Sequence, residues 1–213
     1  MIEAIQTAYK NYKFRSKLEA QWAVFFDKLG IEFRYEVEGF ELSGSYRMRY
    51  LPDFFLPKYN CWVEIKPTLP TKEEREKAIR LCTGLQTSVI MLCGDAWHDC
   101  TGFGFHYLGT SHKPKSKSDI SPEVFKNTIW ISATECIAII DKEDIAGCFV
   151  GMDYTLDYEW SPVYIAECSK CHAIEFWGVI PQASCKCDES ACNSESPHLI
   201  AAYTAARQAR FGR

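Results

Sequence analysis

The segment of residues 61–93 constrains the fold more than any other, because it holds two short apolar runs on either side of a helix-forming stretch. Residues 61–66 (CWVEIK) and 88–93 (SVIMLC) each have the length and apolar content of a buried strand. Between them, Thr71 and Glu74 have the spacing of a capping box, which predicts a helix that runs to about residue 85. The segment therefore predicts a strand, a helix and a second strand, as in an α/β fold.

The residues before this segment extend the pattern toward the N-terminus. Residues 14–29 carry apolar side chains at helical spacing, and Gly30 fits the position that follows a helix. Residues 32–42 alternate as in a strand, and residues 47–56 predict a second strand that Pro52 interrupts or ends. The expected order over residues 14–93 is thus α-β-β-β-α-β, an α/β fold in which helices flank a mixed sheet.

Composition is that of an ordinary globular protein, with 47% hydrophobic and 24% charged residues in a chain of 213. No apolar run approaches the ~18 residues that span a bilayer, and the N-terminus lacks the apolar stretch of a signal peptide. We therefore expect a cytoplasmic protein with no membrane partner. The net charge of −4 does not favour a nucleic-acid partner, although local basic clusters such as Arg47 with Arg49 could bind nucleic acid. A solvated face is the simpler interpretation of any single cluster.

The strand at residues 61–66 places polar side chains on one face. Because side chains alternate along a strand, Cys61, Val63 and Ile65 should point into the core. Glu64 and Lys66 then emerge together on the opposite face, about 7 Å apart at their α-carbons. A carboxylate and an amine that leave an apolar strand side by side suggest a functional site.

Two more carboxylates lie upstream of this strand. Asp53 is surrounded by large apolar residues in YLPDFF, where an isolated charge would be expensive to bury. A divalent cation shared with Glu64 would offset that cost, since magnesium binds carboxylate oxygens and phosphate. Glu19 lies at the edge of the apolar face of the first helix, which could direct it toward the same place. The alternative for Glu19 is a surface ion pair with a lysine.

Together these residues resemble the PD-(D/E)XK nuclease superfamily. The signature stands as Pro52-Asp53, a gap of ten residues, and then Glu64-Ile65-Lys66, with a helix glutamate in the upstream Arg-Ser-x-x-Glu-Ala segment. The run of residues 14–66 is also similar to small nuclease-like proteins that are common in phages and mobile elements. The resemblance covers roughly residues 12–108, which is about half of the chain.

The resemblance implies a role for each residue of the motif. Asp53 and Glu64 would bind Mg²⁺ or Mn²⁺, with the backbone carbonyl of Ile65 as a further ligand. Lys66 would orient the attacking water or stabilise the charge that develops on the phosphate, and Glu19 would hold the metal or its water. The expected activity is hydrolysis of phosphodiester bonds in DNA. On the helix that follows, Gln86 is a further polar candidate.

A separate pattern occupies the last quarter of the chain, where five of the eleven cysteines fall within residues 168–192. The other six are scattered and are expected to be small buried hydrophobes in a reducing compartment. Within the cluster, a C-x-x-C and a C-x-C pair are separated by thirteen residues, which suits a tetrahedral zinc site. The predicted ligands are Cys168, Cys171, Cys185 and Cys187.

Alternatives remain for this cluster. Cys192 could replace either of the last two ligands, and His172 or His198 could contribute. The zinc is expected to be structural, holding together a module too small to form its own core. Redox chemistry at the C-x-x-C is the other interpretation, but such motifs usually begin a helix, whereas the following HAIEFWG is typical of a strand.

These expectations divide the chain into three parts: a nuclease core at residues 1–110, a linker and extension at 111–160, and a zinc-ribbon-like module at 161–213 that ends in a helix at 197–211. Besides a nuclease, two other functions fit. One is a non-catalytic nucleic-acid-binding protein that retains the nuclease fold. The other is a protein of a phage or mobile element that binds a host factor. A protein partner or a second copy of the chain is a further expected partner.

Overall fold

The computed structural model describes residues 5–42, 47–85, 87–96, 101–107, 151–153, 158–162, 164–177, 185–187 and 192–212. The predicted linker at 109–122, the apolar stretch at 129–140 and the candidate Gln86 lie outside these ranges. Among the helices in the described ranges, none combines the length and the hydropathy that crossing a bilayer requires.

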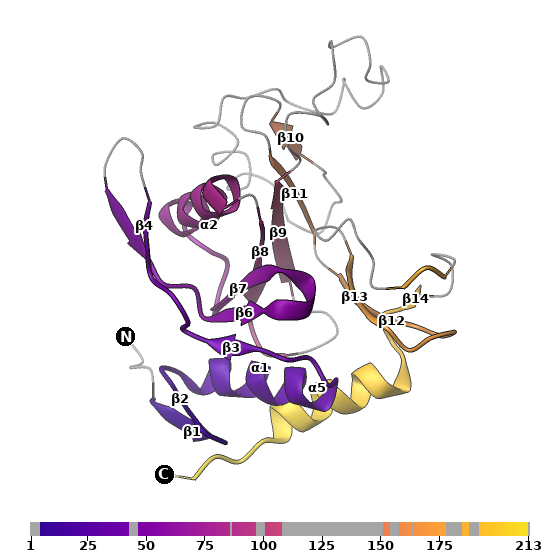
Figure 1. The fold of residues 1–213 in the computed structure, drawn as a ribbon. Helices are drawn as coiled ribbons and strands as arrows, with labels where there is room; N and C mark the ends of the chain where they lie inside the picture. The colour runs from indigo at the N-terminus through magenta and orange to yellow at the C-terminus, as the bar shows by residue number, and fades with distance from the viewer. Residues whose placement is uncertain are drawn as a thin grey trace.

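A seven-stranded sheet forms the centre of the fold (Figure 1), in the order β10-β11-β9-β8-β7-β6-β3. Within it the β7–β8 pair is parallel and the other pairs are antiparallel. Helix α2 (Lys72–Leu85) connects β7 to β8, which is the kind of crossover that parallel neighbours need. The strands are β3 (Arg34–Tyr35), β6 (Phe54–Leu56), β7 (Cys61–Lys66), β8 (Ser88–Cys93), β9 (Thr101–Tyr107), β10 (Gly151–Asp153) and β11 (Tyr158–Pro162).

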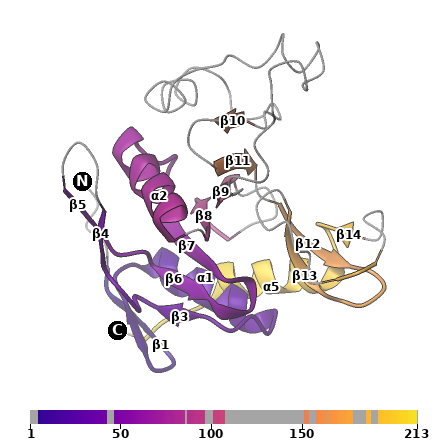
Figure 2. The same cartoon turned by 45° about the horizontal axis from the view of Figure 1, so that its top comes forward.

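Helices cover both faces of this sheet. Helices α1 (Lys17–Lys28) and α5 (Pro197–Gln208) lie side by side on one face, and α2 lies on the other (Figures 1 and 2). Val63 and Ile65 of β7 belong to the apolar cluster on the α1–α5 face, whereas Trp62 belongs to the cluster under α2. Phe25 of α1 stacks on Tyr203 of α5 with ring centroids 4.5 Å apart. The C-terminal helix therefore completes the core that the N-terminal helix begins.

Three smaller sheets surround the central one, and a 3-10 turn, η1 (Pro57–Tyr59), links β6 to β7. The first two are hairpins, and the β4–β5 hairpin lies beside α2 (Figure 2). The third joins the cysteine-bearing segments to the C-terminal helix. Their strands are β1 (Thr7–Tyr9) with β2 (Tyr12–Phe14), β4 (Phe40–Leu42) with β5 (Met48–Tyr50), and β12 (Tyr164–Cys168) between β13 (Ile174–Trp177) and β14 (Cys192–Asn193).

Several sequence predictions are confirmed. The strands at residues 61–66 and 88–93, and the helix between them, form as expected. Thr71 and Glu74 make the predicted capping box, with the Thr71 N–H donating to Glu74 Oε2 at 2.7 Å and the Glu74 N–H donating to Thr71 Oγ1 at 3.3 Å. Gly30 adopts a left-handed φ of +65° after α1, which a glycine does without steric penalty. The coarse expectation of a mixed α/β fold holds.

Other boundaries are wrong. The single strand predicted at 32–42 is two strands in different sheets, because Glu36 takes a φ of 45° and its N–H donates to the Asp53 carbonyl. The first helix begins after residue 16 and not at 14, since Ser16 caps it and Phe14 belongs to β2. The last helix ends at Gln208, before the predicted residue 211.

The described residues of the three predicted parts of the chain pack against one another. Strand β10 lies within the predicted extension at 111–160 and β11 crosses its end, and both continue the central sheet beside β9. In the C-terminal part, the Tyr59 hydroxyl donates to the carbonyl of Ile174 at 2.9 Å, and the Tyr59 ring lies edge-on to Phe176. The cysteine-bearing sheet is thus anchored on the turn between β6 and β7.

Candidate functional site

Strand register brings Asp53 and Glu64 together. Phe55 pairs with Trp62 and Phe54 with Val63, so Asp53 lies opposite Glu64 at the next position along the two strands. Both carboxylates are buried, with 2% of Asp53 and 6% of Glu64 exposed. Burial and then the charge of Glu64 raise the pKa of Asp53 to about 8, and burial also raises the pKa of Glu64. The fold therefore holds two acids next to each other where neither ionises easily.

The two oxygens of Asp53 have fixed partners. Oδ2 accepts a hydrogen bond from the backbone N–H of Ile65 at 2.7 Å, which ties Asp53 to the neighbouring strand β7. Oδ1 lies 2.6 Å from the guanidinium of Arg15, just before α1. Arg15 also lies 2.5 Å from Glu36 Oε1, so this cation is shared between two carboxylates.

Lys66 sits between two further carboxylates. Its Nζ lies 2.8 Å from Glu64 Oε1 and 2.8 Å from Glu74 Oε1, the latter in the first turn of α2. Burial alone would lower the pKa of Lys66, but these two partners raise it. The side chain is therefore a fixed cation beside Glu64, as expected from their alternation on β7.

Two polar atoms beside this cluster, Glu64 Oε2 and the Tyr50 hydroxyl, are buried and make no hydrogen bond of good geometry. Burial, then the charges of Glu64 and Asp53, and a hydrogen-bonding contact with Glu64 raise the pKa of Tyr50 well above its ordinary value, so the phenol and this carboxylate face each other. An unsatisfied buried polar group costs a fold about 1–3 kcal/mol. A cation or a polar ligand at this point would satisfy the free carboxylate oxygen.

Glu19 lies beside the cluster but faces the cap of α1. Its Oε1 accepts the Ser16 hydroxyl at 2.7 Å, and its Oε2 accepts the Tyr35 hydroxyl at 2.6 Å and the Arg15 N–H at 3.1 Å. Its charge is near enough to raise the pKa of Asp53. Glu19 thus reaches Asp53 through electrostatics and through Arg15, while both of its oxygens are engaged in capping contacts.

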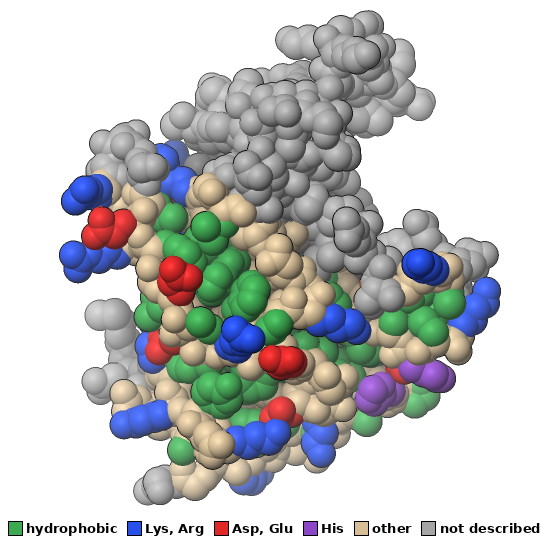
Figure 3. Space-filling model, in the orientation of Figure 1, with side chains coloured by type: hydrophobic (Ala, Val, Ile, Leu, Met, Phe, Trp, Pro, Cys, Tyr) green, Lys and Arg blue, Asp and Glu red, His purple; other side chains and the backbone are tan. Residues whose placement is uncertain are grey.

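A pocket of about 590 Å³ opens onto Glu64 and Lys66. Tyr50 and residues of the β4–β5 hairpin form one wall, Arg15 lies at one side, and Glu74 contributes from α2. Apolar side chains on this face of the molecule are interspersed with lysine, arginine and acidic ones (Figure 3). Asp53 is nearly inaccessible and is not among the residues that line the pocket.

Sequence reasoning missed three groups of this site: Arg15, Tyr50 and Glu74. The sequence gives no prediction for Arg15, and for Glu74 it indicates only the cap of α2. Neither residue carries a local signal for its second contact, since Arg15 meets Asp53 across 38 positions of the chain. Tyr50 stands three residues before Asp53, and strand alternation would place two such residues on opposite faces, so the sequence carries no local signal for Tyr50 either.

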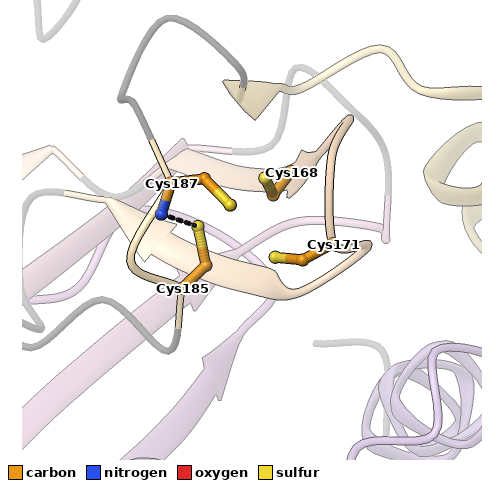
Figure 4. Close-up of side chains that lie close together, drawn as sticks. All are labelled: Cys168, Cys171, Cys185 and Cys187. Carbon is orange, nitrogen blue, oxygen red and sulfur yellow. Dashed lines mark hydrogen bonds between the residues drawn. The ribbon is translucent and has the colours of Figure 1, made fainter.

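The predicted zinc ligands come together in the C-terminal part. Their Sγ atoms all lie within 4.8 Å of one another (Figure 4), a spacing that suits a metal with Zn–S bonds of about 2.3 Å. This is the one group of three or more potential metal ligands that lie so close within the described ranges. The four cysteines could therefore hold a metal such as zinc; they are Cys168, Cys171, Cys185 and Cys187.

The local backbone conformation explains how Cys168 and Cys171 are placed. Cys168 ends β12, and the chain turns back into β13 with the His172 N–H donating to the Cys168 carbonyl at 2.8 Å. The N–H groups of Cys171 and Lys170 lower the pKa of the Cys168 thiol to about 6. A C-x-x-C in a β-turn with thiolate character suits metal binding, and it lacks the helix start that is usual for redox motifs.

The alternative ligands have other roles. Cys192 pairs with Cys168 in the β12–β14 ladder but is not a member of the four-sulfur group. The Nδ1 atoms of His172 and His198 lie 3.0 and 3.3 Å from Glu167 Oε1. Glu167 also accepts the Ser196 hydroxyl, which links the turn of the cysteine cluster to the cap of α5.

Comparisons with protein-family models, with curated proteins and with solved structures found no match to this chain. What the site can do must therefore be inferred from its own geometry and chemistry.

Proposed function

We propose that the chain is a metal-dependent nuclease that hydrolyses phosphodiester bonds in DNA at the pocket above Glu64 and Lys66. The observation that supports this most is the pairing of two buried carboxylates, Asp53 and Glu64, beside a fixed lysine. The order of these residues along the chain matches the PD-(D/E)XK motif that the sequence resembles. Burying two acids next to each other costs the fold free energy, which Arg15 and Lys66 offset in part.

The residues present fit a divalent cation. Glu64 Oε2 is buried with no hydrogen bond of good geometry, and burial and then the charge of Glu64 raise the pKa of Asp53, so a cation shared by the two acids would offset both effects. Asp53, Glu64 and the carbonyl of Ile65 would hold Mg²⁺ or Mn²⁺, whose oxygen preference they meet. When bound, such a cation would neutralise phosphate charge and lower the pKa of the attacking water. Glu19 would act from outside this set, since its oxygens hold Ser16, Tyr35 and Arg15.

The protein's own cations would stabilise the negative charge of the phosphate. Lys66 is held at Glu64 and faces the pocket, where its ammonium would stabilise the negative charge that grows on the phosphate. Arg15 is also at the pocket and shares its charge between Asp53 and Glu36. A cation at Asp53 would replace one of these interactions, and Arg15 would then be free to pair with a phosphate oxygen.

Two substitutions test this function. Lys66→Ala should greatly slow Mg²⁺-dependent cleavage of plasmid and oligonucleotide DNA yet leave Mn²⁺ binding largely intact, because the lysine is not a ligand. Asp53→Ala should lose both, because it removes a ligand. Lys58→Ala, an exposed lysine outside the pocket, is the matched control and should cleave as the unchanged protein does.

The same assay separates the rival functions. Cleavage that persists at the unchanged rate in Lys66→Ala would refute the catalytic assignment. DNA binding in Ca²⁺ with no cleavage in Mg²⁺ or Mn²⁺ would favour a non-catalytic nucleic-acid-binding protein. Neither binding nor cleavage would favour a protein that binds a host factor.

We further propose that the metal at the cysteine cluster is a structural zinc. The cluster lies at the end of β12, and through Glu167 and Ser196 it connects to the start of α5, which packs on α1. Protein purified without chelator should contain about one zinc per chain, as a single four-thiolate site requires. Cys171→Ser should lower the zinc content, whereas Cys192→Ser, outside the sulfur group, should retain it.

A further inference from the structure

The shape of the pocket restricts what can reach the acids. Its volume of about 590 Å³ equals that of a cube about 8 Å on a side. A DNA double helix cannot enter such a space, since its major groove alone is about 12 Å wide. Glu64 is 6% exposed and lies at this pocket, while Asp53 lies deeper at 2%. A phosphate must therefore enter the pocket before it can approach them.

The β4–β5 hairpin contributes apolar side chains to the pocket beside its charged ones, Glu41 and Arg49. Phe40 pairs directly with Tyr50 across the hairpin, and both line the pocket. Phe40 is half-buried and stands edge-on to Trp62, with ring centroids 5.1 Å apart at 85°. Leu51 also lines the pocket, and 38% of its surface is exposed. The wall thus offers aromatic and aliphatic surface within a few ångströms of charged groups.

The rim of the pocket is charged, as a nucleotide binding site requires. Arg49 extends from the hairpin with 91% of its side chain exposed, and Lys77 contributes from α2. Both line the pocket together with Lys66 and Arg15; Arg49 lies 4.0 Å from Glu41, and Lys77 pairs with Glu73 at 2.8 Å. Apolar side chains and four cations, set against three carboxylates in the same lining, offer surfaces for the two parts of a nucleotide, a flat base and an anionic phosphate.

We propose that the pocket takes one unstacked nucleotide of the strand to be cut, so that the protein acts on single-stranded or locally unpaired DNA. This inference rests on the proposed nuclease function and adds the class of substrate. The base lies against Phe40 and Leu51, and the phosphate points toward Lys66 and Glu64. In an intact duplex the bases are stacked and paired, and no nucleotide can enter without the energy of extrusion.

Gly39 offers a way to close the pocket without disturbing its walls. A Cβ built on Gly39 would meet only the Leu51 Cδ1 at 4.0 Å, so a side chain there has room at its base and would project into the space beyond. Gly39→Leu is therefore expected to fold and to fill the position of the base. Phe40→Ala removes the aromatic surface and leaves the space open.

The test uses three labelled DNA probes of one sequence: a single strand, a fully paired duplex, and a duplex with a short unpaired bubble. In Ca²⁺ the single strand should bind at least tenfold more tightly than the duplex, with the bubble between them. Phe40→Ala should weaken single-strand binding by about fivefold to a hundredfold, the usual range for loss of one base–aromatic stack. Gly39→Leu should weaken it similarly. Val37→Ala, an exposed apolar residue outside the pocket, is the control.

Cleavage in Mg²⁺ distinguishes failure of this inference from failure of the proposed function. Duplex cut as fast as single strand, with the rate abolished by Lys66→Ala, would overturn the inference and leave the nuclease assignment standing. Unchanged single-strand affinity in both folded Phe40→Ala and Gly39→Leu would also overturn it. Absence of Mg²⁺- or Mn²⁺-dependent cleavage of all three probes would overturn both, whereas preferential cleavage of the single strand and the bubble supports them.

Discussion

Replacing Asp53 by asparagine should stabilise the metal-free protein, although Asp53 is buried and makes two strong contacts. The fold raises the pKa of Asp53 from 3.8 to about 8. Each pKa unit corresponds to about 1.4 kcal/mol, so at pH 7 the buried acid costs the fold up to roughly 4 kcal/mol. Asparagine keeps the size and the acceptor for the Ile65 N–H but loses the ion pair with Arg15. We expect a net gain of about 1–3 kcal/mol in the free energy of unfolding.

The assay is urea unfolding in EDTA between pH 5 and 9. Because the pKa of Asp53 is higher in the folded state, the folded state binds more protons between about pH 4 and 8. Stability of the unchanged protein should therefore fall as the pH rises through this window, and Asp53→Asn should flatten the slope. Its gain should be largest near pH 8 to 9 and should shrink toward pH 5.

A second carboxylate of the same site, Glu74, serves as a control, because its substitution should change the stability in the opposite direction. Burial alone would raise the pKa of Glu74, but its contacts with Lys66 and Thr71 lower it. Its contribution is thus favourable at neutral pH and is lost as the pH falls, and Glu74→Gln should destabilise the protein by up to about 1 kcal/mol. A loss of stability in Asp53→Asn that is equal at pH 5 and pH 9 would refute the electrostatic reasoning.

Three further predictions concern the two metal sites. Calorimetry should find that Mg²⁺ binds more tightly as the pH rises from 6 to 8, since the cation competes with a proton on Asp53. A Mg²⁺ affinity that does not change with pH would show that the metal binds away from Asp53. Tyr50→Phe should change the free energy of unfolding by less than about 1 kcal/mol, because the buried hydroxyl makes no hydrogen bond of good geometry and faces the Glu64 carboxylate, and a larger loss would contradict this. Cys171→Ser should lower the melting temperature of the whole protein in calorimetry and not of a C-terminal part alone, because α5 shares the core of α1, whereas Cys192→Ser should change it little.

The parts of the fold that sequence predicts well are those with a local cause. The strand β7 and its alternation follow from six residues, and the helix α2 follows from the Thr71–Glu74 cap. The four-cysteine cluster follows from two short spacings, and the sulfur geometry selects Cys185 and Cys187 over Cys192. In each case the chemistry depends on residues a few positions apart.

What sequence could not predict depends on contacts between distant segments. The break at Glu36 comes from a hydrogen bond to the Asp53 carbonyl, which an alternating pattern over residues 32–42 does not reveal. Glu19 was expected to face a metal, and its oxygens are instead engaged by Ser16 and Tyr35; the Ser16–Glu19 spacing is itself a capping box and carried this signal. When the local sequence is compatible with two structures, contacts with distant residues decide which of them forms.

The balance of charge in the pocket makes the order of binding predictable. Four cations line it, namely Arg15, Arg49, Lys66 and Lys77, against three carboxylates, Glu41, Glu64 and Glu74, with Asp53 directly beneath. Without a divalent cation the site is close to neutral, and a phosphate gains little there; a divalent cation adds two positive charges at the same place.

DNA affinity should therefore rise at least tenfold from EDTA to Ca²⁺ at constant ionic strength. Glu64→Gln removes one negative charge from the pocket, so in EDTA this variant should bind the single-stranded probe more tightly than the unchanged protein, while it gains less from Ca²⁺. Equal affinity of the unchanged protein in EDTA and Ca²⁺ would show that the phosphate does not bind beside the acids.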